Sequence, residues 1–189
     1  MGRIMIIVDP QNDFIHGSLS VNNAIDKMNA LVSYLEKNIT QYDNIIITVD
    51  WHPFNHISFK ENGGEWPTHC VQNSIGAAIY QPILDILIKH KSKVTFYYKG
   101  YEDEQEAYSF LTHSSNEQTF LLSLKANYQN CQIDICGIAN EYCVLNTVKD
   151  LTEKMCLNEK MNILMDYVAE IKDKSILENY AKEHQITII

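Results

Sequence analysis

Short apolar runs alternate along this chain with stretches in which apolar residues recur at helical spacing. This alternation is typical of right-handed β-α-β units built around a mostly parallel sheet. Six strands are predicted, at residues 4–8, 45–49, 94–98, 133–136, 161–165 and 186–188. Each run is apolar on both faces, as expected of parallel strands that helices cover on both sides. Helices are predicted between them, at about 24–38, 82–90, 117–126, 141–155 and 173–183. The expected fold is α/β, with three α/β/α layers and a mostly parallel sheet.

The composition is that of an ordinary globular chain. Its 189 residues suffice for one domain with a substantial core, and no internal repeat or break in composition divides them, so a single domain over 1–189 is predicted. The net charge of −9 is spread along the chain, which disfavours nucleic acid and anionic membranes as partners and favours a small-molecule substrate. No apolar run could span a bilayer, and the five cysteines form no CxxC pair, so we expect a cytoplasmic protein.

Chemically useful side chains follow several of the predicted strands. In an open parallel sheet, ligands bind beyond the carboxyl ends of the strands, so these residues share one edge. Asp9 follows the first strand and Lys99 the third, and Cys143 comes after the fourth, near the start of a predicted helix. The free amides and the dipole of a helix start favour a thiolate. Asp9 could then move the thiol proton beside a positive Lys99, and amides near Ala139 and Cys143 could hold an oxyanion.

Taken singly, each of these residues has an ordinary structural role. A cysteine in an apolar helix usually packs in the core, an aspartate at a strand end usually caps a turn, and a lysine usually reaches solvent. Their joint placement at one edge of the sheet favours an active site instead. No histidine stands in an obvious dyad with the cysteine, which disfavours a papain-like mechanism.

A cluster of metal-ligand residue types follows the second predicted strand. Asp50 and His52 are two residues apart at a strand end, so their side chains leave on the same side. Pro53 turns the chain there, which lets His56 fold back, and a longer loop can deliver His69. Three imidazoles and one carboxylate suit a divalent ion such as zinc, manganese or iron(II). The competing interpretation is a set of polar loop residues.

Five segments of the chain together resemble the isochorismatase-like cysteine hydrolases, and in particular their nicotinamidase branch. The matching segments occur in the family's order, at residues 7–14, 50–59, 66–73, 98–100 and 137–144. The resemblance implies an isochorismatase-like fold and an enzyme that hydrolyses nicotinamide to nicotinate and ammonia through a thioester, in NAD salvage. It also implies activity on pyrazinamide, and it leaves a homo-oligomer open.

The resemblance assigns roles to individual residues as well. It implies that Cys143 is the nucleophile, Asp9 the general base and acid, and Lys99 the third catalytic member. It implies a cis peptide between Ile138 and Ala139, which aims an amide at the oxyanion. The implied ligands of one divalent ion, with zinc preferred over manganese or iron, are Asp50, His52, His56 and His69. The implied walls of the substrate pocket are Phe14, Leu19, Trp66 and Tyr108.

The sequence departs from the family pattern at two places. The cysteine motif, commonly Ala-Thr-Asp-x-Cys, has Asn140 and Glu141 at its second and third positions. In the loop after the third predicted strand, Glu106 and Ala107 stand where the family has Asp-Ser. We therefore expect rearranged contacts around the cysteine loop and at one edge of the pocket.

Three other functions are compatible with parts of the sequence. One is another isochorismatase-like hydrolase, acting on a small amide, a ureido acid or a vinyl ether; the metal-ligand set argues against it. Another is a catalytically silent metal-binding protein, although Asp9, Lys99 and Cys143 are all present. The third is a redox sensor that pairs Cys143 with Cys136. Outside these motifs, replacing His90 or His113 is expected to change little.

Overall fold

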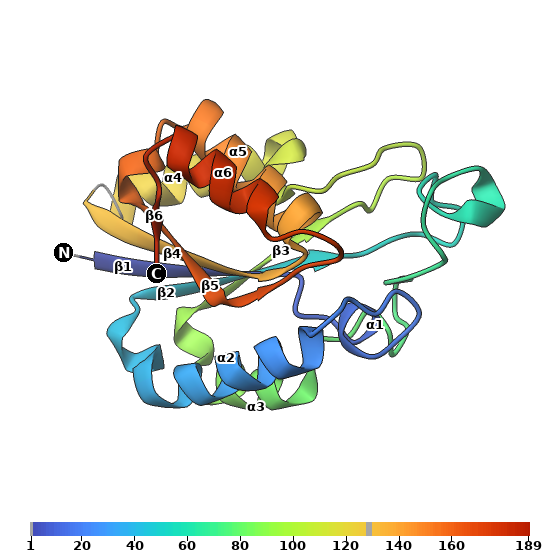
Figure 1. The fold of residues 1–189 in the computed structure, drawn as a ribbon, viewed down its shortest axis with the longest axis horizontal. Coiled ribbons are helices and arrows are strands. Elements are labelled where there is room, and N and C mark those ends of the chain that lie inside the picture. Colours follow the sequence, from blue (N-terminus) through green and yellow to red (C-terminus); the bar gives the residue numbers. More distant parts are fainter. Residues whose placement is uncertain (1, 128–129) are drawn as a thin grey trace.

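Six parallel strands form the centre of the computed structural model, which describes residues 2–127 and 130–189 (Figure 1). The strands lie in the order β3-β2-β1-β4-β5-β6, and every neighbouring pair is parallel. Their bounds are β1 Gly2–Val8, β2 Asn44–Asp50, β3 Val94–Lys99, β4 Cys131–Ile138, β5 Met161–Ala169 and β6 Thr187–Ile188. The predicted fold class and all six predicted strands are thereby confirmed.

Helices cover both faces of the sheet, so the molecule has three layers (Figure 1). One face carries α2 (Ala24–Asn38) and α3 (Gln81–Lys89). The other face carries α4 (Ser114–Asn127), α5 (Leu145–Glu153) and α6 (Ser175–Glu183). A short helix, α1 (Asn12–Ile15), lies among the long loops beyond the strand ends. Single 3-10 turns span Ile39–Gln41, Lys60–Asn62, Lys91–Lys93, Phe110–Thr112 and Asn158–Lys160.

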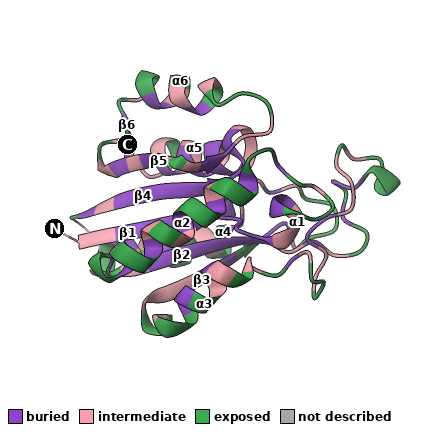
Figure 2. Cartoon of the chain, turned by 60° about the horizontal axis from the view of Figure 1, so that its bottom comes forward, coloured by how far each residue is buried: buried purple, intermediate pink, exposed green. Residues whose placement is uncertain are grey.

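The core lies where the central strands meet the helices. Residues 4–8 of β1 have no exposed surface, and Ile6 is in register with Ile46 of β2 and Ile135 of β4. Branched aliphatic side chains of this kind pack well on a pleated sheet. Figure 2 shows the resulting burial of β1, β2 and β4. Helix α2 packs on the sheet through residues at helical spacing, namely Ala24, Met28, Leu31 and Leu35.

Three details differ from the sequence-based expectation. Strand β3 is not covered on both faces, because it lies at the edge of the sheet and leaves Phe96 and Tyr98 exposed by 38% and 44%. Strand β5 continues to Ala169, and its register against β4 shifts along the way. The helix predicted at 141–155 is divided into a π-helical turn, Asn140–Val144, and the α-helix α5.

The strand order places a crevice at the ends of β1 and β4. From β1 the chain passes to β2 on one side, whereas β4 lies on the other side, and such a reversal is where open α/β sheets bind ligands. Gly137 near the end of β4 has a φ of +124°, and a Cβ atom there would lie 2.1 Å from the carbonyl oxygen of Val8. A glycine is therefore required for β1 and β4 to approach closely at the crevice.

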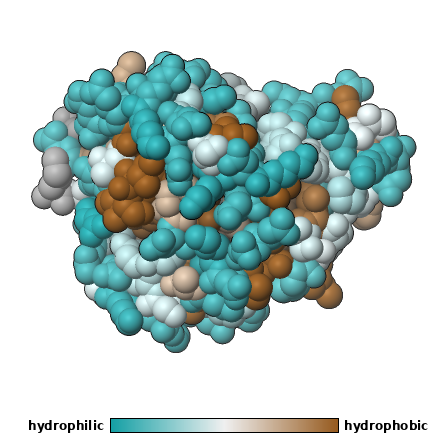
Figure 3. All heavy atoms as spheres, viewed as in Figure 1, coloured by the Kyte–Doolittle hydropathy of each residue, from teal (hydrophilic) through white to brown (hydrophobic). Residues whose placement is uncertain are grey.

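The surface is mainly polar, with small apolar patches on the face drawn in Figure 3. The most exposed large apolar side chains of the described residues are Ile75 and Phe54, both in the long segment between β2 and α3. Within the described ranges, no helix has the length and apolar character needed to cross a membrane.

Candidate active site

Asp9, Lys99 and Cys143 converge at the crevice, as predicted from their positions after three strands. The Lys99 Nζ atom lies 2.8 Å from Asp9 Oδ2 and 3.5 Å from Cys143 Sγ. Lys99 and Asp9 are completely buried, and Cys143 is exposed by only 6%. An acid, an ammonium group and a thiol are therefore held in mutual contact away from bulk water.

Neighbouring charges set the ionisation of this group. Burial alone would lower the pKa of Lys99, but the carboxylates of Asp50 and Asp9 raise it well above its ordinary value. Burial raises the pKa of Asp9, against the opposing effect of Lys99. The hydroxyl of Thr48 donates to Asp9 Oδ1 at 2.5 Å and fixes the orientation of the carboxyl group. Lys99 therefore stays charged. The raised pKa of Asp9 makes its carboxylate a better proton acceptor.

The position of the thiol differs from the sequence-based expectation. Cys143 does not lie in the first turn of an α-helix but within the π-helical turn that precedes α5. Burial raises its pKa well above the ordinary value, partly opposed by Lys99, and a hydrogen bond to Asp9 also favours the protonated form. Burial and the contact with Asp9 thus favour the thiol, whereas the charge of Lys99 favours the thiolate.

The predicted cis peptide between Ile138 and Ala139 is present. Ala139 precedes the π-helical turn, and its carbonyl oxygen accepts hydrogen bonds from the amides of Tyr142 and Val144. Ala139 and Cys143 both line the same small cleft. That their own amides hold an oxyanion stays a prediction.

Three of the four predicted metal ligands come together. Ligand atoms of Asp50, His52 and His69 all lie within 4.8 Å of one another, and His52 Nε2 is 3.6 Å from Asp50 Oδ2. The Nδ1 atom of His52 donates to the Gly100 carbonyl and that of His69 donates to the Pro67 carbonyl, each at 2.8 Å. These bonds fix the tautomers and leave both Nε2 atoms as ligands, which is the usual arrangement around zinc. The donor set therefore fits a divalent metal ion.

His56 lies beside this cluster, but both of its ring nitrogens form hydrogen bonds to residues outside the cluster. Its ring stacks on that of His52, with centroids 4.0 Å apart. Its Nε2 atom donates to the Gln105 carbonyl at 3.1 Å, and its Nδ1 atom is 2.6 Å from the hydroxyl of Ser58. Burial lowers the pKa of His56 to about 4, so the ring is neutral at pH 7. The ring of His56 therefore lies against the cluster, but its ligand atoms are not grouped with those of the other three residues.

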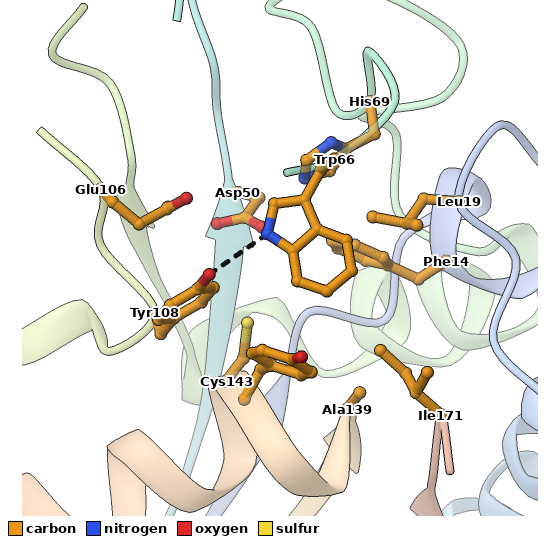
Figure 4. Close-up of a pocket in the computed structure, with 11 residues that line it drawn as sticks. Phe14, Leu19, Asp50, Trp66, His69, Glu106, Tyr108, Ala139, Cys143 and Ile171 are labelled. Atoms are coloured by element: carbon orange, nitrogen blue, oxygen red, sulfur yellow. Dashed lines mark hydrogen bonds between the residues drawn. The ribbon is translucent and has the colours of Figure 1, made fainter. Parts of the chain in front are cut away.

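The four predicted pocket residues line one cleft with the thiol, as Figure 4 shows. The cleft holds about 370 Å³ of empty space, part of it open to solvent. Its lining includes Asp50 and His69 on one side and Ala139 and Cys143 on another. The predicted wall residues within it are Phe14, Leu19, Trp66 and Tyr108. A flat ring bound there would contact aromatic groups and lie near both the thiol and the metal-ligand cluster.

Sequence reasoning missed several residues at this site. Glu106, Tyr142 and Ile171 also line the cleft. Burial raises the pKa of Glu106, and the charge of Asp50 raises it further. The sequence signalled Glu106 only as a departure from the family, and it offered no signal for Ile171. His113 is not isolated from the site, because its buried Nε2 atom accepts a hydrogen bond from the Gly100 amide at 3.3 Å.

Known proteins resemble this chain in both sequence and structure. No protein-family model matches it. The nicotinamidase of Saccharomyces cerevisiae is 29% identical over 99% of both chains. The nicotinamidase/pyrazinamidase of Mycobacterium tuberculosis is 32% identical, over 78% of this chain and 77% of that protein.

The solved structures that superpose well on this chain include enzymes of the same names. The pyrazinamidase of Pyrococcus horikoshii in complex with zinc is 31% identical and superposes with a TM-score of 0.78, over 100% of this chain and 99% of that one. The yeast nicotinamidase bound to the inhibitor nicotinaldehyde gives a TM-score of 0.84 at 26% identity, over 99% of each chain. The fold is thus that of the isochorismatase-like hydrolases. Within that class, the chain belongs to the nicotinamidase and pyrazinamidase family.

Proposed function

We propose that the protein hydrolyses nicotinamide to nicotinate and ammonia, as a step in NAD salvage, and that it also accepts pyrazinamide. Family membership makes it an amide hydrolase. The observation that carries the proposal is the contact of Lys99 with both Asp9 and Cys143 at the base of an aromatic cleft. The same cleft is lined by metal-ligand residues, which are not needed to recognise an amide alone.

The reaction would run through a thioester on Cys143. Asp9 takes the thiol proton, and the sulfur attacks the carboxamide carbon while amides of Ala139 and Cys143 stabilise the oxyanion. Asp9 then returns the proton to the departing ammonia. A water molecule, deprotonated by Asp9, releases nicotinate and restores the thiol. Lys99 balances the negative charge in each of these states.

Asp50, His52 and His69 would hold one divalent ion, for which we propose zinc, with manganese and iron as the alternatives. When bound, such an ion supplies a Lewis acid that can hold the pyridine nitrogen and orient the ring. His56 can become a fourth ligand only if its Nε2 atom leaves the Gln105 carbonyl. Phe14 packs against the His69 ring, with centroids 5.5 Å apart, and so connects the ring wall to the metal-ligand cluster.

The alternative functions have less support. An N-carbamoylsarcosine amidase shares the fold at 18% identity, so the fold alone leaves the amide substrate open. A silent scaffold is disfavoured by the assembled triad. A redox pair of Cys143 with Cys136 is disfavoured because Cys136 is completely buried, and burial raises its pKa far above the ordinary value. All five cysteines are free thiols, which supports a cytoplasmic location.

The test is ammonia release from nicotinamide, pyrazinamide and benzamide, with metal content measured on the same sample. Nicotinamide should exceed benzamide in kcat/KM by roughly a hundredfold or more, because benzamide lacks the ring nitrogen. Cys143→Ala should lower turnover at least about a thousandfold, whereas Cys136→Ala should leave it nearly unchanged. If a ureido acid is added to this panel, release of ammonia from it but not from nicotinamide would instead favour the first alternative.

A further inference from the structure

The carboxylate of Glu141 binds three successive backbone amides of another segment. Its Oε2 atom accepts from the Ile171 amide at 2.9 Å. Its Oε1 atom accepts from the Lys172 amide at 2.6 Å and from the Asp173 amide at 2.8 Å. Glu141 belongs to the π-helical turn that carries Cys143. The bound segment lies thirty residues further along the chain, in the connection between β5 and α6.

This contact is strong for its position near the surface. Burial would raise the pKa of Glu141, but the three amide hydrogen bonds outweigh it and lower the pKa below its ordinary value. A carboxylate that collects successive N–H groups makes charge-assisted bonds, which are stronger than neutral ones. Asn140, the other departure in the motif, adds a long hydrogen bond of 3.5 Å to the Asp173 carbonyl. Both residues that depart from the family motif therefore form hydrogen bonds with the same segment.

The bound segment supplies one wall of the cleft. Ile171 lines the cleft beside Ala139 and Cys143, opposite the side on which Glu106 and Tyr108 lie in Figure 4. A second contact, from the Asn22 side chain to the Ile171 carbonyl at 3.1 Å, holds the segment from the other direction. Glu141 thus connects the segment that carries Ile171 to the turn that carries Cys143, and it makes three of the hydrogen bonds that hold this segment.

We propose that Glu141 is a positioning residue that sets the width of the cleft by holding Ile171 beside Cys143, and that Ile171 thereby selects against substituted rings. The inference rests on the proposed amide hydrolysis. A purely structural role for Glu141 would affect stability without affecting which rings are accepted. The two roles differ in measurable ways.

Kinetics on nicotinamide and its ring-methylated derivatives provide the first test. Relative to the wild type, Glu141→Ala should raise KM for nicotinamide several-fold and reduce discrimination against the most strongly rejected methylated ring by about tenfold, the scale expected for one methyl group in a pocket. Ile171→Ala should reduce discrimination similarly. The double variant should show little more than Ile171→Ala alone, because one residue acts through the other.

Alkylation of Cys143 provides a second test that needs no substrate. Peptide mapping would follow the rates at Cys143 with iodoacetamide and with the bulkier N-ethylmaleimide. Glu141→Ala and Glu141→Gln should raise the N-ethylmaleimide rate relative to the iodoacetamide rate, because a wider cleft favours the larger reagent. Asp43→Asn is the matched control: Asp43 accepts the Arg3 amide at 2.9 Å at the other end of the sheet, and its loss should leave both rates unchanged.

The outcomes separate the inference from the function on which it rests. Wild-type protein that releases no ammonia from nicotinamide would overturn the proposed function, and the alkylation ratio would still decide the role of Glu141. Active wild-type protein, together with Glu141 variants that melt earlier but keep ring discrimination and the alkylation ratio, would overturn the inference. If Glu141→Ala fails to fold, Glu141→Gln serves in its place, since it retains one acceptor oxygen.

Discussion

The Nζ atom of Lys99 lies 2.8 Å from Oδ2 of Asp9, although strand β2 separates the strands that carry them. The lysine side chain reaches across the end of β2, where it also pairs with Asp50. All three groups are buried. An ammonium group between two carboxylates stays charged in such surroundings because each charge offsets the desolvation of the others. The ends of three strands are thus joined by one side chain.

Removing this lysine should destabilise the fold and abolish activity. Lys99→Met leaves two buried carboxylates without a cation, and breaking a buried pair in this way typically costs about 3–5 kcal/mol. Chemical denaturation of metal-free protein would measure the loss. Lys154→Met is the control, because the Lys154–Asp150 pair is partly exposed and should contribute about 0–1 kcal/mol. Equal stabilities for Lys99→Met and the wild type would contradict the ionised arrangement described above.

The predicted metal ligands should differ in how strongly their loss lowers metal content and activity. His52→Ala and His69→Ala should release the bound metal and reduce activity, since both Nε2 atoms face the shared site. His56→Ala should have a smaller effect on metal content, because His56 Nε2 donates to the Gln105 carbonyl. His90→Ala, at the end of α3, is the control. Elemental analysis of the purified variants decides the order, and a metal-free but fully active wild type would argue against the whole site.

His113 should influence metal binding without touching the ion. Its Nε2 atom accepts from the Gly100 amide, and the Gly100 carbonyl accepts from His52, so the backbone of one residue, Gly100, connects the two rings. His113→Leu should weaken metal binding about tenfold, as losses of such supporting contacts commonly do. His113→Gln should be milder, because its amide oxygen can replace the lost acceptor.

Chelator competition would measure metal affinity in these two variants. His184→Phe is a matched control, since the His184 ring stacks on Tyr180 as the His113 ring stacks on Tyr101, with centroids 4.1 Å and 4.0 Å apart. Unchanged affinity in His113→Leu would restore the sequence-based expectation that this residue is dispensable.

The contribution of Glu141 to stability should depend on pH. Its pKa is lowered in the folded protein, so its stabilising effect is present above the unfolded pKa of about 4.3 and is lost as the pH falls through the lower folded value. The difference in melting temperature between the wild type and Glu141→Gln should therefore be largest near neutral pH and shrink below about pH 4. A difference that is constant from pH 7 to pH 3 would mean that the charge of Glu141 is unimportant.

The sequence alone was sufficient to predict the fold and the side chains that meet at the ends of the strands. Apolar periodicity distinguishes strands from helices because burial in each follows its own repeat, so the parallel sheet could be inferred before any contact was known. Because ligands bind at the carboxyl ends of parallel strands, Asp9, Lys99 and Cys143 were predicted to lie close together. The structure confirms that Lys99 contacts both of the others. The resemblance to a family supplied the pocket residues, all of which line the cleft.

The tertiary structure decided what depends on partners far apart in the chain. The sequence could not reveal that Nε2 of His56 donates to the carbonyl of Gln105, which lies 49 residues away. It could not reveal that Glu141 binds the segment carrying Ile171, since an isolated glutamate carries no periodic signal. Local sequence determines which faces are buried, whereas loop hydrogen bonds depend on which distant backbone groups the fold brings within about 3 Å. For this reason, the strands and the contact of Asp9 and Cys143 with Lys99 were predictable, but the hydrogen bonds of the loops around the cleft were not.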